Sequence, residues 1–198
     1  MNLNKLRDKA YQCAVAHGWH EENLSDEHFL CLVISELMEA VEADRKGRHA
    51  DTKKFNQEMD YYIHEMKLYG ENYDKAYRDT FEYYLKDSVE DELSDACIRL
   101  LDLAGLRNIN LSSVSFPISN SAEHIGSRRK LSFTEWCYDV ASSIARYNKD
   151  CFPIFFFVGI LQEMCCIAEI IGFDILWHIE QKIKYNELRP YKHGGLVY

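Results

Sequence analysis

Two pairs of carboxylates, each with its members three residues apart, are the side chains of this sequence best suited to chemistry. Glu36 and Glu39 form the first pair, and Glu92 and Asp95 form the second. Residues three apart lie on one side of a helix, and apolar residues flank both pairs. Buried carboxylates this close repel each other unless a cation lies between them. A hard divalent cation such as Mg²⁺ prefers oxygen ligands of this kind.

A single acidic pair has a simpler interpretation, in which it belongs to a solvated stripe that pairs with Arg45 and Lys46. The second pair favours the metal site. If the two segments form helices that pack side by side, four carboxylates surround one point, and helix bundles build metal sites from side chains on facing helices in this way.

Both acidic pairs fall in segments with helical periodicity. Residues 31–47 and 88–105 repeat apolar side chains at steps of three and four, which is the pattern of a helix with one apolar face. We expect the rest of the chain to be organised around the first of these helices. Ser25 is placed to cap its beginning.

The same periodicity extends through most of the chain, which holds only three prolines and nine glycines. We therefore expect an all-α helical bundle that forms a single domain over residues 1–198. The expected remaining helices are 3–16, 51–68, 73–85, 132–147, 152–171 and 175–188, with a loop-like segment over 107–130. Ser132 with Glu135, and Asp174, should cap the helices that follow them.

Composition excludes several classes of partner. The formal net charge of −9 argues against a nucleic acid, although it allows a nucleotide held through a metal ion. Seven cysteines without a Cys-x-x-Cys pair indicate reduced core residues in a cytoplasmic protein. The N-terminus lacks an apolar signal region, and residues 152–172 read as a buried core helix, so we expect no membrane partner.

Three segments together resemble a known family. The acidic pairs resemble the E-x-x-E … E-x-x-D signature of the all-α NTP pyrophosphohydrolases, the MazG-like and dimeric dUTPase-like enzymes. GWHEEN followed by ISELMEAVEADRKG, and DELSDACIRLLDLAG, look like the two acidic segments of that family. WHIEQKIKYNELRPYKHGG is similar to its K-x-x-Y-N-x-x-R-P-Y-K-H-G ending. The resemblance covers residues 17–47, 88–106 and 172–195.

The resemblance implies a role for each matched residue. Glu36, Glu39, Glu92 and Asp95 would be the catalytic ligands of Mg²⁺, or of Mn²⁺. Lys182, Asn186 and Arg189 would bind the substrate phosphates. Their spacing of i, i+4 and i+7 would place a cation, an amide and a second cation in one row on a helix.

The implied reaction is hydrolysis of a nucleoside triphosphate between its α- and β-phosphates, which gives a monophosphate and pyrophosphate. One of the four carboxylates, for example Glu39, would accept the proton of the attacking water. Trp19 or Trp177 could stack on the base, although a core or surface role for either is equally open. The resemblance also implies a homodimer or a larger homo-oligomer. Insertions near 51–87 and 108–171 depart from the family pattern and leave the base and sugar undetermined.

Two other functions fit part of the pattern. A ferritin-like di-iron oxidase needs Glu-x-x-His pairs, and no histidine in this sequence has a glutamate three residues before it. A non-enzymatic helical interaction protein would leave the acidic pairs solvated. Thermal stabilisation by a metal ion would separate the enzyme from the interaction protein.

Overall fold

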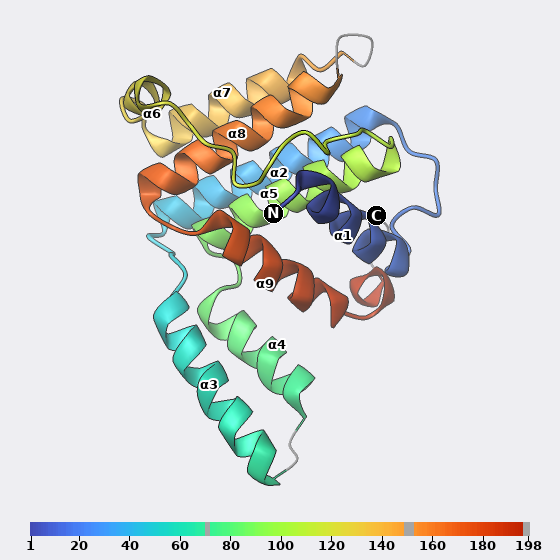
Figure 1. The fold of residues 1–198 in the computed structure, drawn as a ribbon, viewed down its shortest axis with the longest axis vertical. Coiled ribbons are helices and arrows are strands. Elements are labelled where there is room, and N and C mark those ends of the chain that lie inside the picture. Colours follow the sequence, from blue (N-terminus) through green and yellow to red (C-terminus); the bar gives the residue numbers. More distant parts are fainter. Residues whose placement is uncertain (70–71, 149–152, 196–198) are drawn as a thin grey trace.

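A computed structural model describes residues 1–69, 72–148 and 153–195, and its described part is built from helices (Figure 1). Within these residues no strand forms, and an isolated bridge between Asn2 and Ser115 is the one β-type pairing. The expected all-α bundle is confirmed. The helices are α1 Leu3–Ala16, α2 Asp26–Arg45, α3 Thr52–Tyr69, α4 Tyr73–Tyr84, α5 Val89–Leu106, α6 Ala122–Arg128, α7 Phe133–Ala145, α8 Pro153–Ile171, α9 Ile175–Glu187 and a 3₁₀ turn, Tyr191–Gly194.

The second acidic helix, α5, lies at the centre of the bundle, rather than the first acidic helix, α2. Fourteen of the 18 residues of α5 are buried, because α1, α2, α8 and α9 all pack against it. Gly105 permits close packing of α1, since a Cβ atom at this position would lie 2.5 Å from the Cβ atom of Tyr11. The expectation that residues 31–47 would be the organising helix is therefore wrong.

Side-chain caps fix the beginnings of the helices that matter for the site. Ser25 caps α2, Ser88 caps α5 and Asp174 caps α9, each by accepting a hydrogen bond from a backbone N–H of the first turn. Ser132 and Glu135 form a reciprocal capping box at α7. The predicted caps at Ser25, Ser132 and Asp174 are confirmed.

The two segments predicted as insertions form different structures. Helices α3 and α4 make a hairpin that projects from the bundle, as Figure 1 shows. A small apolar cluster joins its base to α9; it comprises Phe55, Met59, Tyr77, Phe81, Leu85 and Tyr185. The second segment adds α7 and α8 to the opposite side of the bundle, and its expected loop contains the short helix α6.

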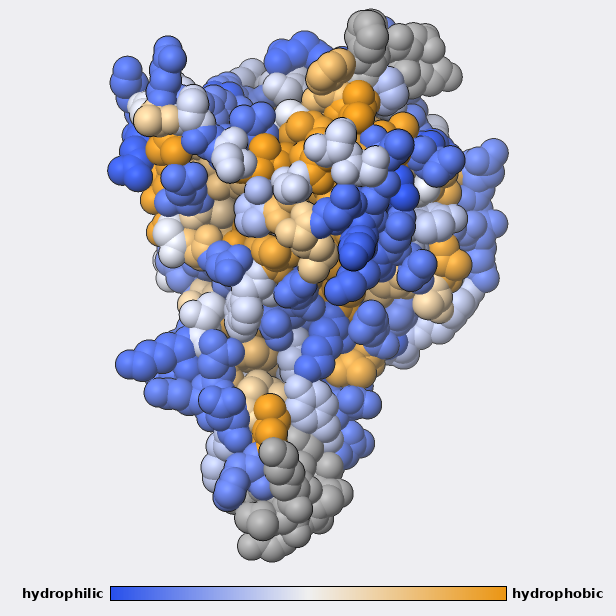
Figure 2. Space-filling model, in the orientation of Figure 1, coloured by the Kyte–Doolittle hydropathy of each residue, from blue (hydrophilic) through white to orange (hydrophobic). Residues whose placement is uncertain are grey.

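Helix α8 is the one helix of the described chain that is long and apolar enough to cross a membrane, with 44% of its most apolar 18-residue window buried. One face, including Phe157, Leu161 and Met164, packs in the core. Phe155, by contrast, is 72% exposed. In Figure 2, apolar surface gathers over α8, whereas the α3–α4 hairpin is mostly hydrophilic where it is coloured. The prediction that this segment is a buried core helix therefore holds for one face of α8. Phe152 lies outside the described residues.

The cysteines of the described chain are free thiols. Cys97, Cys137, Cys165 and Cys166 are buried, as expected for small core residues. Cys31 differs, because it lies on the exposed side of α2, and Cys13 is partly exposed. Cys151 lies outside the described residues.

Candidate functional site

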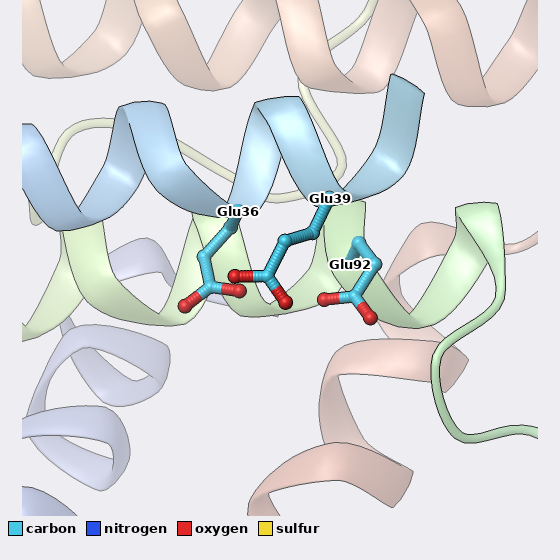
Figure 3. Close-up of side chains that lie close together, drawn as sticks. All are labelled: Glu36, Glu39 and Glu92. Carbon is cyan, nitrogen blue, oxygen red and sulfur yellow. The ribbon is translucent and has the colours of Figure 1, made fainter. Parts of the chain in front are cut away.

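Three of the four predicted carboxylates converge between α2 and α5. Glu36 and Glu39 extend from α2 toward Glu92 on α5 (Figure 3). One carboxylate oxygen from each residue lies within 4.8 Å of the others. Oxygen ligands of an octahedral Mg²⁺, each 2.0–2.1 Å from the ion, are separated by about 3–4 Å. The three carboxylates could therefore hold such an ion after small side-chain movements.

The three carboxylates differ in burial. Glu36 and Glu92 are each 5% exposed, whereas Glu39 is exposed, so the first pair is only partly buried. Arg45 and Lys46 pair with Glu42 rather than with either member of the first pair. The simpler interpretation, a solvated acidic stripe, therefore fits Glu39 but does not fit Glu36 or Glu92.

Burial and mutual repulsion disfavour the charged forms of the two buried glutamates. Burial, and then Asp91 and Asp95, raise the pKa of Glu92 to about 9. Burial and Asp95 raise the pKa of Glu36 to about 7, although Arg99 opposes this shift. Both carboxylates therefore need a further cation, in addition to Arg99 and Lys182, to be fully ionised at neutral pH.

Asp95, the fourth predicted ligand, does not join this group. Its Oδ2 atom lies 2.8 Å from the Lys182 ammonium. Asp91 makes an equal contact of 2.8 Å with the same ammonium and also accepts a hydrogen bond from the backbone N–H of Asp87. A second acidic grouping, which shares Glu92, includes Asp87 and Asp91, but Asp91 already has these two donors. Asp95 is thus a partner of Lys182 in this structure.

Lys182 is also placed differently from the prediction. Instead of facing a phosphate site, it is 5% exposed and is enclosed by Asp91, Asp95 and the rings of Phe81 and Tyr185. Burial alone would lower its pKa, but the two aspartates raise it above the ordinary value, so the ammonium stays charged.

A cavity of about 190 Å³ begins beside this ion pair and extends between α1, α2, α5 and α9. Asn186 and Arg189, two of the residues predicted to bind phosphates, line this cavity, and their role there stays a prediction. The Oδ1 atom of Asn186 is buried and has no hydrogen-bond partner among the described residues. Apolar side chains form the rest of one wall, including Phe29 and Leu32. The cavity therefore combines a polar end near α9 with an apolar surface.

The C-terminal turn closes one side of the cavity by docking on the loop after α1. The backbone N–H of Lys192 donates to the carbonyl of His17, 3.0 Å away, and the His17 ring lies 3.1 Å from the carbonyl of Arg189. Trp19 packs edge-on against His193, with 4.9 Å between ring centroids. Burial and Arg189 lower the pKa of His193 to about 4, so its ring is neutral at pH 7.

Of the two tryptophans considered for base stacking, Trp19 lines the cavity. Trp177 instead packs against Phe55 at the base of the hairpin, with 5.7 Å between ring centroids. The possible stacking role of Trp177 is therefore not supported by its position.

Sequence reasoning missed three polar residues on the inner face of α5. Arg99 donates through Nε to Glu36 and also lines the cavity. Asp102 lines the cavity and lies 2.7 Å from His20 Nε2. Asp91 binds Lys182. Asp91 lies four residues before Asp95, and Arg99 and Asp102 lie four and seven residues after it. This spacing places all three on the same side of α5 as Asp95, so it could have identified them.

Comparison of the chain with protein-family profiles, characterised proteins and solved structures finds no match.

Proposed function

We propose that this protein is a metal-dependent nucleoside triphosphate pyrophosphohydrolase, which cleaves between the α- and β-phosphates. The observation that supports this most is the position of the three carboxylates. Glu36, Glu39 and Glu92 converge on one another, and Asn186 and Arg189 line the neighbouring cavity. The carboxylates and the cavity meet through Arg99, which contacts Glu36 and belongs to the cavity wall.

In this proposal, Glu36, Glu39 and Glu92 hold Mg²⁺ or Mn²⁺. The bound ion would neutralise phosphate oxygens and lower the pKa of a water molecule. Glu39 is the best placed of the three to accept a proton, because it is exposed and its one described hydrogen bond is a 3.3 Å contact from Ser35. Arg189 and Asn186 would orient the phosphates, and Trp19 and Phe29 would contact the nucleoside.

The decisive assay measures the products. With Mg²⁺, we expect the wild-type protein to convert at least one ribo- or deoxyribonucleoside triphosphate to the monophosphate and pyrophosphate, and EDTA should abolish the reaction. Chromatography of the nucleotides and a coupled pyrophosphate assay would identify both products. A diphosphate with free phosphate would contradict the proposal, because it indicates attack at the terminal phosphorus. Inactivity on every triphosphate would also contradict it.

Metal affinity should depend on pH. Glu36 and Glu92, with pKa values of about 7 and about 9, hold protons that a metal ion must displace. We therefore expect the affinity for Mg²⁺ to rise about tenfold or more between pH 6 and pH 8. Calorimetry in two buffers with different ionisation enthalpies would count the released protons. An affinity that is constant over this range would show that metal binding does not displace protons from these carboxylates.

The predicted homodimer or larger homo-oligomer and the predicted cytoplasmic location stay predictions.

A further inference from the structure

Helix α5 carries a row of polar side chains that runs from the carboxylate group, meaning the cluster of Glu36, Glu39 and Glu92, to the cavity. Glu92, Asp95, Arg99 and Asp102 follow one another at steps of three, four and three residues, so they share one face of the helix. At 1.5 Å per residue, the row is about 15 Å long. Glu92 belongs to the carboxylate group, and the other three residues line the cavity.

Arg99 is the cation of this row and belongs to both parts of the site. Its Nε donates to Glu36, and its side chain is 43% exposed on a helix that is otherwise largely buried. Among the described residues, Glu36 is the one hydrogen-bond partner of its guanidinium. The two terminal nitrogens are therefore free of protein acceptors in the described chain, on a side chain that lines the cavity.

Lys182 does not supply a comparable charge to the cavity. Asp91 and Asp95 each bind its ammonium at 2.8 Å, and it is not among the residues that line the cavity. Arg189 lines the cavity but follows the end of α9, whereas Glu36, Glu39 and Glu92 are on α2 and α5. A polyphosphate that extends from the cavity toward Glu36 would therefore meet Arg99 at the junction.

We infer that Arg99 binds the substrate phosphates and couples their binding to that of the metal ion. The inference rests on the proposed function. A guanidinium can bind a phosphate through two parallel hydrogen bonds, which an ammonium cannot reproduce. When Arg99 binds a phosphate, its hold on Glu36 weakens, and that carboxylate becomes a better metal ligand. Nucleotide and metal therefore strengthen each other's binding, and by linkage the effect is reciprocal.

Calorimetry on Arg99→Gln tests the inference without turnover. The probes are Mn²⁺ alone and an α,β-methylene nucleoside triphosphate, titrated with and without Mn²⁺. We expect the affinity for the triphosphate analogue to fall about tenfold or more, because charge-assisted hydrogen bonds to phosphate are lost. The affinity for Mn²⁺ alone should stay the same or increase, because a cation that competes for Glu36 is removed. The gain in analogue affinity on adding Mn²⁺ should shrink.

Two further variants make the test specific. Arg45→Gln removes an exposed arginine that pairs with Glu42 on α2, and it should bind both probes as the wild type does. Arg99→Lys keeps the charge but not the two-pronged geometry, so it should bind the analogue more weakly than the wild type; it also serves if Arg99→Gln does not fold.

Three results would count against the inference. If Arg99→Gln and Arg99→Lys bind the analogue as tightly as the wild type, Arg99 does not contact phosphate. If Arg99→Gln loses affinity for Mn²⁺ and analogue in parallel, Arg99 only holds Glu36 in place. A wild-type protein that binds neither probe would overturn the proposed function itself, whereas the first two results overturn the role of Arg99 alone.

Discussion

Replacing Glu39 by glutamine is expected to lower the turnover number by about a hundredfold or more at saturating nucleotide and Mg²⁺. The amide keeps the size of the side chain but loses the charge that binds the metal and accepts a proton. Because Glu39 is exposed, the variant should fold like the wild type, so the loss can be assigned to chemistry. Steady-state pyrophosphate release, measured beside the thermal melting curve, tests this.

Glu42→Gln is the matched control for this experiment. Glu42 lies on the same helix, three residues later, and pairs with Arg45 and Lys46 on the surface. Its replacement should leave the turnover number unchanged. Equal activity of Glu39→Gln and the wild type would exclude Glu39 from the metal site. Equal losses in both variants would indicate a general effect of charge on α2.

Replacing Lys182 by methionine should cost about 3–5 kcal/mol of unfolding free energy, since breaking a buried ion pair leaves an uncompensated charge. Lys182 is the cation that both Asp91 and Asp95 contact, and Asp91 is 2% exposed. Denaturant unfolding at pH 7, followed by circular dichroism, would measure the change. For this reason a loss of activity in a Lys182 variant cannot be assigned to substrate binding without a stability measurement.

A double variant sharpens the prediction. Adding Asp91→Asn to Lys182→Met removes the stranded charge and should recover part of the lost stability, which a double-mutant cycle would report as coupling. Lys54→Met, at an exposed pair with Asp51, should change the stability by less than about 0.5 kcal/mol. If Lys182→Met unfolds at the same denaturant concentration as the wild type, the buried ion pair does not stabilise the fold.

The helices could be predicted from the sequence because their signals are local. Apolar periodicity depends on the residues of one helix, and a cap such as Ser25 depends on the next turn, so no knowledge of neighbouring elements is needed. The position of α5 at the centre could not be predicted in this way. An almost fully buried helix is recognised only when the elements that cover it are known, and α8 and α9 come much later in the chain.

The sequence indicated which types of side chain the candidate site contains, but it did not indicate which of them are buried or which partners they contact. A spacing of three places Glu36 and Glu39 on one side of α2, yet the two side chains are about 60° apart around the helix axis. That difference lets the packing against α5 bury Glu36 and leave Glu39 exposed. Likewise, the distance of Asp95 from Glu92 says nothing about Lys182, whose approach depends on how α9 lies across α5.

The described residues of the α3–α4 hairpin contribute no ligand to the cluster of Glu36, Glu39 and Glu92, yet the base of the hairpin shields the buried ion pair. The ring of Phe81, near the end of α4, stacks on Tyr185 with 4.4 Å between centroids, and both rings flank the Lys182 ammonium. The packing of Phe81 and its neighbours therefore constrains the base of the hairpin. Shortening the tip of the hairpin should leave the stacked rings of Phe81 and Tyr185 intact, whereas a deletion that reaches Phe81 would admit water to Lys182 and its two aspartates.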